Sequence, residues 1–131
     1  MQLLTPRTAF RIAAAAGFLA VAFGAFGAHG LKDFLARRPG AAEWWEKAVF
    51  YHLIHAVVLL GLPLVRPLPV AAFVLCALGM IGFSGSLYLL ALTGAYWLVF
   101  VTPIGGLCLL GSWLTLILGA GRLRLENETP P

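Results

Sequence analysis

The sequence is short of charge. Only 11% of its 131 residues are Asp, Glu, Lys or Arg, whereas 61% are hydrophobic. A soluble domain usually carries about 25% charged residues, so this chain has too few to cover a water-facing surface. Acidic residues are the scarcest, and none lies between Glu46 and Glu126. This composition excludes an ordinary soluble domain and leaves most of the chain without carboxylates for acid–base chemistry or metal binding.

Cysteine is scarce as well. The two cysteines, Cys76 and Cys108, both fall inside apolar runs, where free cysteine behaves as a small hydrophobic residue. No disulfide framework or CxxC metal site is indicated. The net charge is +4, but the basic residues lie at the ends of the apolar runs. We therefore expect anionic lipid headgroups, and not nucleic acid, to be their partner.

Long charge-free runs fill the rest of the chain. A helix needs about 20 mostly apolar residues to cross about 30 Å of hydrocarbon. The sequence therefore predicts an all-α fold, an integral membrane four-helix bundle formed by a single domain, residues 1–131. The expected spans are 9–29, 44–65, 68–92 and 97–120.

The first span has an alternative interpretation as a cleaved signal peptide, with Arg7 and Arg11 before an apolar stretch and small residues around Ala20–Ala22. The apolar stretch continues well past that point. We therefore expect a retained helix.

The connections set the layout of the bundle. Pro63, Pro67 and Pro69 predict a tight hairpin between the second and third spans, and residues 93–96 predict another before the fourth. The only long connection, 29–47, has apolar residues at helical spacing. It predicts a short interfacial helix over 31–38 between the first two long helices, although a solvated charged loop is an equal alternative. The tail, 122–131, is expected to be disordered.

Charge alone leaves the orientation open. Four spans place both termini on one side, with five Lys and Arg residues there and four on the other: Arg7, Arg11, Arg66, Arg122 and Arg124 against Lys32, Arg37, Arg38 and Lys47. The excess of basic residues that marks the cytoplasmic side is therefore too small to decide.

Small residues recur at four-residue spacing. In lipid, helices associate through close backbone approach, so such stripes predict bundle seams or, alternatively, a homo-oligomer face. The residues expected to pack are Ala16, Ala20, Gly24, Gly82 and Gly111.

Polar residues from three spans reach one predicted depth. His55 lies roughly 10 Å inside its run, and similar depths hold for Ser86 and for Thr102-Pro103. The expected layer comprises His52, His55, Ser84, Ser86, Thr102 and Pro103. We predict that His55 points into the bundle and meets Ser84, Ser86, Thr102 or a Val99 carbonyl freed by Pro103. His52 is expected to lie nearer the interface and to be more dispensable.

Three functions compete for this layer. We favour hydrogen bonding that holds the bundle together over a proton or small-solute site. A metal or haem site is the third. Its ligands would be His29, His52 and His55, with Asp33, Glu43 and Glu46 as the only acidic candidates. We expect no bound metal or cofactor.

Enzymatic chemistry is not predicted. Ser84 and Ser86 flank Gly85, but a nucleophile elbow needs a strand-to-helix turn and an acidic partner. We interpret these residues as packing groups, with no catalytic residue in the chain.

Several motifs follow one another in a specific order. They are GAFGAHG (24–30), Tyr51 with His55, FSGSLYLLAL (83–92), FVTPIGG (100–106) and GSW (111–113). In order and spacing the chain resembles the YgdD-like family of small bacterial inner-membrane proteins, a domain of unknown function with mitochondrial relatives. The resemblance covers residues 8–122 and includes His55 but not His52. It implies four spanning helices, an inner-membrane location and cytoplasmic termini, and it implies no activity.

The expected function is that of an accessory or assembly factor, or a subunit of a larger membrane complex. The alternative is a small oligomeric transporter or channel that uses the polar layer. The expected partners are the lipid bilayer and other membrane proteins, or further copies of the chain. Six aromatic residues would anchor the long-loop side or bind a protein there: Trp44, Trp45, Tyr51, Tyr88, Tyr96 and Trp97.

Overall fold

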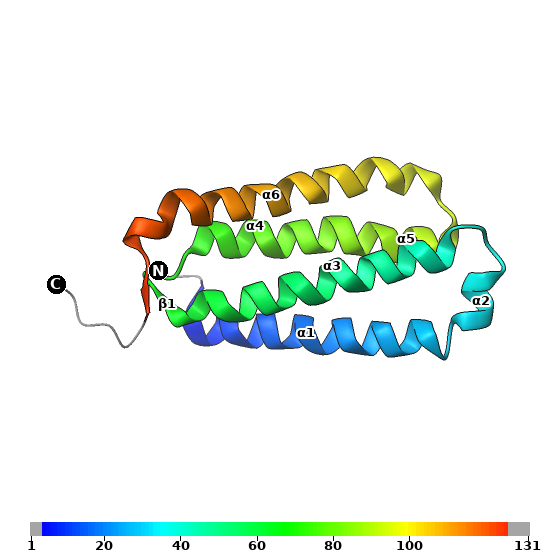
Figure 1. Cartoon of the computed structure of the whole chain (residues 1–131), viewed down its shortest axis with the longest axis horizontal. Coiled ribbons are helices and arrows are strands. Elements are labelled where there is room, and N and C mark those ends of the chain that lie inside the picture. The colour runs from blue at the N-terminus through cyan, green and yellow to red at the C-terminus, as the bar shows by residue number, and fades with distance from the viewer. Residues whose placement is uncertain (1–3, 126–131) are drawn as a thin grey trace.

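The computed structural model describes residues 4–125 and places four long helical segments side by side (Figure 1). The first is α1 (Pro6–Ala28) and the second is α3 (Ala41–Gly61). The third runs from α4 (Val70–Met80) through a π-helical turn, η2 (Ile81–Gly85), into α5 (Ser86–Thr93). The fourth joins η3 (Tyr96–Phe100) to α6 (Val101–Gly119).

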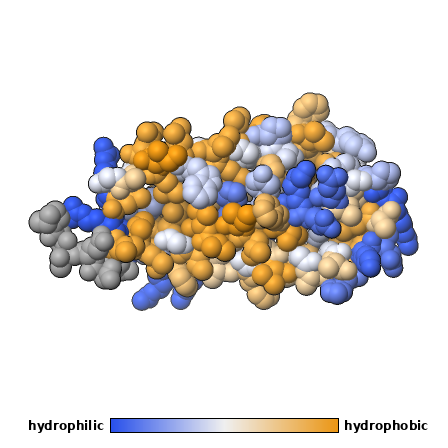
Figure 2. Space-filling view, in the orientation of Figure 1, coloured by the Kyte–Doolittle hydropathy of each residue, from blue (hydrophilic) through white to orange (hydrophobic). Residues whose placement is uncertain are grey.

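Each segment is long and apolar enough to cross a membrane. The candidate spans are Pro6–Ala28, Ala41–Leu64, Val70–Thr93 and Tyr96–Arg122. Figure 2 shows hydrophobic residues over most of the length of one face and hydrophilic residues gathered toward its two ends. The predicted all-α membrane bundle is confirmed.

The helices pack in a simple order. α1 packs against α3, α3 packs against α4 and α5, and α4 packs against α6. One apolar cluster, which includes Ala13, Leu59 and Phe73, fills the end near β1. A second, which includes Trp45, Tyr88 and Leu98, fills the end near α2. α1 is therefore a peripheral helix held mainly by α3.

The long connection contains the predicted helix, though it is shorter than expected. α2 (Lys32–Ala36) lies across one end of the bundle (Figure 1). The Arg38 guanidinium then donates a 2.7 Å hydrogen bond to the Ala91 carbonyl oxygen near the end of α5. Gly94 follows α5 with φ +69°, a conformation that favours glycine. The connection is thus attached to the turn between the third and fourth segments.

The opposite end holds a two-stranded ribbon. After η1 (Leu62–Leu64), β1 (Val65–Arg66) pairs antiparallel with β2 (Arg124–Leu125), and η4 (Ala120–Arg122) precedes β2. The predicted disordered tail begins at residue 122, whereas Arg124 and Leu125 are paired with Arg66 and Val65 in this ribbon. The remaining tail residues, 126–131, lie outside the described residues.

The small residues predicted to pack between helices differ in how closely they do so. Ala16 and Ala20 are buried, and a Cβ added at Gly24 or Gly82 would lie 3.3 Å from Val49 or 3.0 Å from Gly105. At Gly111 the nearest atom would be 3.6 Å away, an ordinary contact. Gly111 therefore packs against Leu75 of α4, but without the close approach seen at Gly82. α6 approaches the third segment closely at Gly105, opposite Phe83, and at Leu109, opposite Gly79.

Candidate functional site

His55 points into the bundle from α3. Its side chain is 6% exposed, and its Nδ1–H donates to the Tyr51 carbonyl oxygen at 2.8 Å. Nε2 is then free of hydrogen and accepts a long hydrogen bond, 3.4 Å, from the Trp113 indole N–H on α6. One neutral tautomer satisfies both contacts.

This geometry matches the predicted direction of His55 but not its predicted partner. The ring reaches the fourth segment through Trp113, and not through Ser84, Ser86, Thr102 or the Val99 carbonyl. His55 forms its hydrogen bonds with Tyr51 and Trp113, so a Val99 carbonyl freed by Pro103 is not its partner. Trp113 belongs to the GSW motif, so the sequence contained the signal.

His52 is buried, contrary to the prediction that it reaches water or headgroups. It is 7% exposed, and its Nδ1 is joined to the Tyr88 hydroxyl on α5 by a 3.2 Å hydrogen bond. α3 begins at Ala41, well before the charge-free run that starts at Ala48. His52 therefore lies roughly 16 Å from the beginning of the helix. That position is near the middle of the span Ala41–Leu64.

An aromatic cluster surrounds His52 and joins three segments. The Trp45 indole N–H on α3 donates to the Phe23 carbonyl oxygen on α1 at 2.9 Å. The Tyr88 ring lies 4.7 Å from that of Trp45 and 5.0 Å from that of Phe23 between centroids. Trp45 and Tyr88 were expected at the interface, and that expectation is wrong. Tyr96 and Trp97 are exposed at the α2 end of the bundle.

Ser86 and Thr102, which the sequence places at one depth as candidate partners of His55, bind each other instead. The Ser86 and Thr102 hydroxyl oxygens lie 2.7 Å apart, and each hydroxyl also contacts a carbonyl oxygen of its own segment, that of Phe83 or Leu98. A further bond that the sequence analysis missed runs from the Ser112 hydroxyl on α6 to the Ala72 carbonyl oxygen on α4, at 2.8 Å. These bonds hold the third and fourth segments together.

Ser84 is the exception. It lies in the π-helical turn η2 and is 2% exposed. Its hydroxyl is the only buried side-chain nitrogen or oxygen between residues 4 and 125 without a hydrogen-bond partner. π-Helical turns inside α-helices occur frequently at functional sites.

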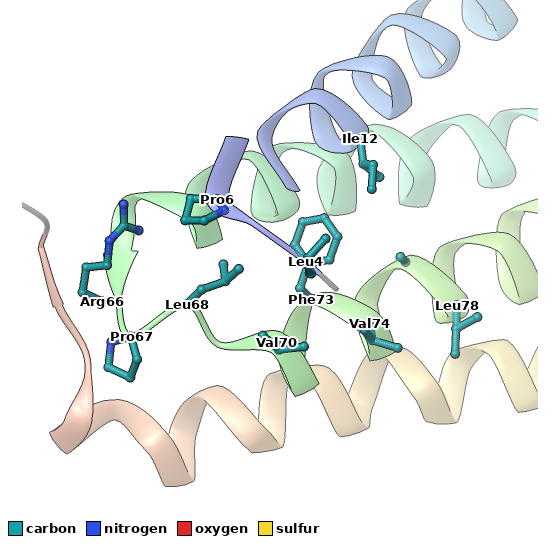
Figure 3. A pocket seen from close by; sticks show the side chains of 11 residues that line it. Leu4, Pro6, Ile12, Arg66, Pro67, Leu68, Val70, Phe73, Val74 and Leu78 are labelled. Atoms are coloured by element: carbon teal, nitrogen blue, oxygen red, sulfur yellow. The ribbon is translucent and has the colours of Figure 1, made fainter. Parts of the chain in front are cut away.

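Ser84 also borders a groove between α1 and the α4–η2–α5 segment. The middle cavity of the groove, about 410 Å³, is lined by His52, Ser84 and Tyr88 together with apolar residues such as Phe23 and Met80. It shares Ile12 and Ala77 with an end cavity of about 860 Å³ near Arg66. Figure 3 shows that end cavity, with Leu4 and Phe73 between the start of α1 and α4.

A third cavity, about 420 Å³, extends the groove toward α2. It shares Phe23, Gly85 and Tyr88 with the middle cavity. The three cavities therefore follow one another along the side of the bundle.

The histidines do not form a metal centre in the described part of the chain. His29 is exposed at the end of α1, and no group of three or more His, Cys, Asp or Glu residues that could hold a metal occurs within 4–125. His52 and His55 are instead bonded to Tyr88 and Trp113 on different helices. Both rings therefore act as hydrogen-bonding links between spans.

Comparison with known proteins identifies the family. Residues 23–106 match the family model described as "Protein of unknown function (DUF423)". The UPF0382 inner membrane protein YgdD of Escherichia coli K12 is 38% identical, and the match covers 95% of this chain and 97% of that protein. The UPF0382 membrane protein SH2409 of Staphylococcus haemolyticus is 41% identical, over 76% of this chain and 84% of its own.

A third relative, a UPF0382 membrane protein of Haemophilus influenzae, is 35% identical over 83% of this chain and 90% of its own. No solved structure matches. With four helices suited to crossing a membrane and relatives of this length, the chain belongs to the DUF423 family and is a multi-pass inner-membrane protein.

Proposed function

We propose that the protein is an accessory subunit or assembly factor of a larger membrane complex. The proposal rests on the hydrogen bonding of the buried polar side chains within residues 4–125. All of them except Ser84 have hydrogen-bond partners within the protein. Polar side chains that hold helices together in this way are typical of a structural bundle.

A transport pathway through one copy would need polar groups facing a water-filled passage. Here His52 is bonded to Tyr88, His55 to Trp113, and Ser112 to a backbone carbonyl. The surface residues along α6 are large and apolar, for example Leu107 and Leu118. This arrangement supports a protein that binds neighbours in the membrane over one that conducts a solute by itself.

The end of the bundle near α2 is the surface we assign to a partner. Tyr96, Trp97 and Phe100 are all exposed there, and Trp97 is 65% exposed. Trp and Tyr are enriched where proteins bind one another and where spans meet the membrane surface. The long connection places charged side chains at the same end, including Lys32 and Arg37.

The test is purification of the tagged protein from its native membranes in mild detergent. We expect a complex of defined stoichiometry that is lost when Trp97 and Phe100 are both replaced by Ala. Leu118→Ala, at the other end of α6 and 76% exposed, is the matched control and should leave the complex intact. Recovery of only single copies would contradict the proposal. A symmetric homo-oligomer that conducts a solute in vesicles would replace it with transport.

A further inference from the structure

The groove between α1 and the α4–η2–α5 segment opens sideways from the bundle. Residues at its rim are exposed, including Ile12 and Leu19 on α1 and Ile81 on η2. In a membrane these side chains face lipid, so the groove is accessible to molecules dissolved in the bilayer. His52, Ser84 and Tyr88 are the polar residues that line its middle cavity, whose exposed surface is almost entirely apolar.

Ser84 supplies the reason to expect a ligand. An unpaired polar group in hydrocarbon is costly, because no water is present to bond it. The Ser84 hydroxyl has no partner among the described residues, yet Ser84 borders the cavity. The hydroxyl itself is covered, so binding to a molecule in the cavity requires the Ser84 side chain to turn about its one side-chain torsion. A molecule in the groove would then complete its hydrogen bonding.

The depth of Ser84 limits what that molecule can be. Ser84 precedes Thr93, the end of its span, by nine residues, or roughly 14 Å of helix. That is close to the middle of a hydrocarbon core about 30 Å thick. The headgroups of ordinary bilayer lipids lie outside this core, so they do not reach Ser84. The hydrogen-bonding atom must belong to a molecule that dissolves in the hydrocarbon itself.

The lining limits its chemistry further. No Asp, Glu, Lys or Arg occurs among the described residues that line the middle cavity, so a charged ligand would have no counter-ion from them. Phe23, Tyr88 and Met80 offer aromatic and thioether surfaces, which pack well against flat rings. A hydroxyl donor requires an acceptor oxygen, and a carbonyl supplies one without adding a donor that needs its own partner.

We propose that this groove binds a neutral, lipid-soluble carbonyl compound of quinone type. The ring lies in the middle cavity with one carbonyl oxygen accepting a hydrogen bond from Ser84. An apolar tail extends into the adjoining cavity that shares Ile12 and Ala77. This inference rests on the groove alone and holds whether or not the protein is a subunit of a complex.

The test measures binding of a defined probe to the intact protein in lipid nanodiscs. The probe is 2-decyl-1,4-benzoquinone, and decylbenzene is the hydrocarbon control of the same shape. We expect the quinone to raise the melting temperature more than decylbenzene does. Ser84→Ala should weaken quinone binding about five- to tenfold, the effect of one hydrogen bond. The same substitution should leave the ligand-free protein at least as stable, because it removes an unpaired hydroxyl.

Ser112→Ala is the matched control, since its hydroxyl bonds Ala72 away from the groove. It should lower the ligand-free melting temperature and leave the affinity for the quinone unchanged. Equal effects of the quinone and decylbenzene would overturn the proposal, as would equal quinone affinity in Ser84→Ala. A large loss of ligand-free stability in Ser84→Ala would also overturn it, because the hydroxyl would then have a partner within the protein. Tighter binding of decanol than of the quinone would replace the carbonyl compound with a lipid-soluble alcohol.

Discussion

Trp45 on α3 occupies the space that a side chain at position 27 of α1 would need. A Cβ added at Gly27 would overlap the indole ring of Trp45, and the same ring donates its N–H to the Phe23 carbonyl oxygen. Gly27 and Trp45 therefore fix where α1, the peripheral helix, meets the rest of the bundle. The relation joins the GAFGAHG motif to the helix that contains both buried histidines.

Gly27→Ala is expected to destabilise the protein by about 1–3 kcal/mol, the usual cost of overpacking a closed site. The reason is that Trp45 must move and lose its bond to Phe23. Thermal unfolding in detergent measures the effect. Gly61→Ala is the control, because a Cβ at Gly61 meets nothing within 4 Å. Equal melting temperatures for the two variants would show that the indole moves away without cost.

His52 and Tyr88 are expected to stabilise the fold jointly. Each single change, His52→Ala or Tyr88→Phe, leaves a buried polar partner unpaired, at about 1–3 kcal/mol. A double-mutant cycle should then give a coupling of about 0.5–1.5 kcal/mol. This revises the expectation drawn from the sequence, and His52→Ala should now cost about as much as His55→Ala. Additive effects in the cycle would mean that the 3.2 Å contact contributes nothing.

The class of fold follows from composition because a membrane imposes so few solutions. Backbone groups in hydrocarbon must be bonded within their own segment, so long apolar runs have to be helices. The turn between the second and third segments is also predictable locally, because Pro63, Pro67 and Pro69 interrupt a helix. The histidine partners could not be predicted in this way. They depend on where α3 begins, and that start, Ala41, lies among charged residues with no apolar signal.

The groove could not be predicted from the sequence either. Its existence depends on α1 packing against α3 while α4 packs against α6, an arrangement of whole helices. The π-helical turn at Ile81–Gly85 is equally hidden, since the glycines and serines there equally fit a regular helix. Ser84 and Ser86 look alike in the sequence, yet Ser86 is paired with Thr102, whereas the Ser84 hydroxyl has no partner among the described residues.

Gly105 is expected to be the most sensitive small residue of α6. A Cβ there would overlap the backbone of Phe83, and backbone atoms cannot move aside as a side chain can. Gly105→Ala should cost more than about 3 kcal/mol or prevent folding. Gly119→Ala, where a Cβ meets nothing within 4 Å, should be neutral or slightly stabilising. Thermal unfolding and the yield of folded protein report both. A stable Gly105→Ala protein would contradict the close crossing of η2 and α6.

Both termini are expected in the cytoplasm. β1 pairs with β2 at the end of the bundle where α1 begins, so Arg66, Arg122 and Arg124 gather on one side (Figure 1). The resemblance to the YgdD-like family implies this orientation, since five basic residues against four do not decide it by charge. A C-terminal fusion to a reporter that works only in the cytoplasm should be active, and a fusion to a reporter that works only in the periplasm should be inactive. Activity of a periplasmic reporter at the same position would reverse the assignment.

Arg38 is expected to hold the long connection against the end of α5. Its guanidinium donates to the Ala91 carbonyl oxygen at 2.7 Å and packs against Gly94. A cation at a helix C-terminus also interacts favourably with the helix dipole. Arg38→Ala should therefore cost about 1–2 kcal/mol and speed hydrogen exchange at the last turn of α5, because that turn loses its cap.

The neighbouring Arg37 makes a matched control, since it is exposed and lies next to Arg38 in the same connection. Arg37→Ala should leave both stability and exchange nearly unchanged. Arg38→Lys should recover part of the stability, since an ammonium group keeps the charge but not the planar geometry of the guanidinium. If Arg37→Ala and Arg38→Ala behave alike, the connection is held by its apolar contacts through Leu35, which is buried in the cluster near α2.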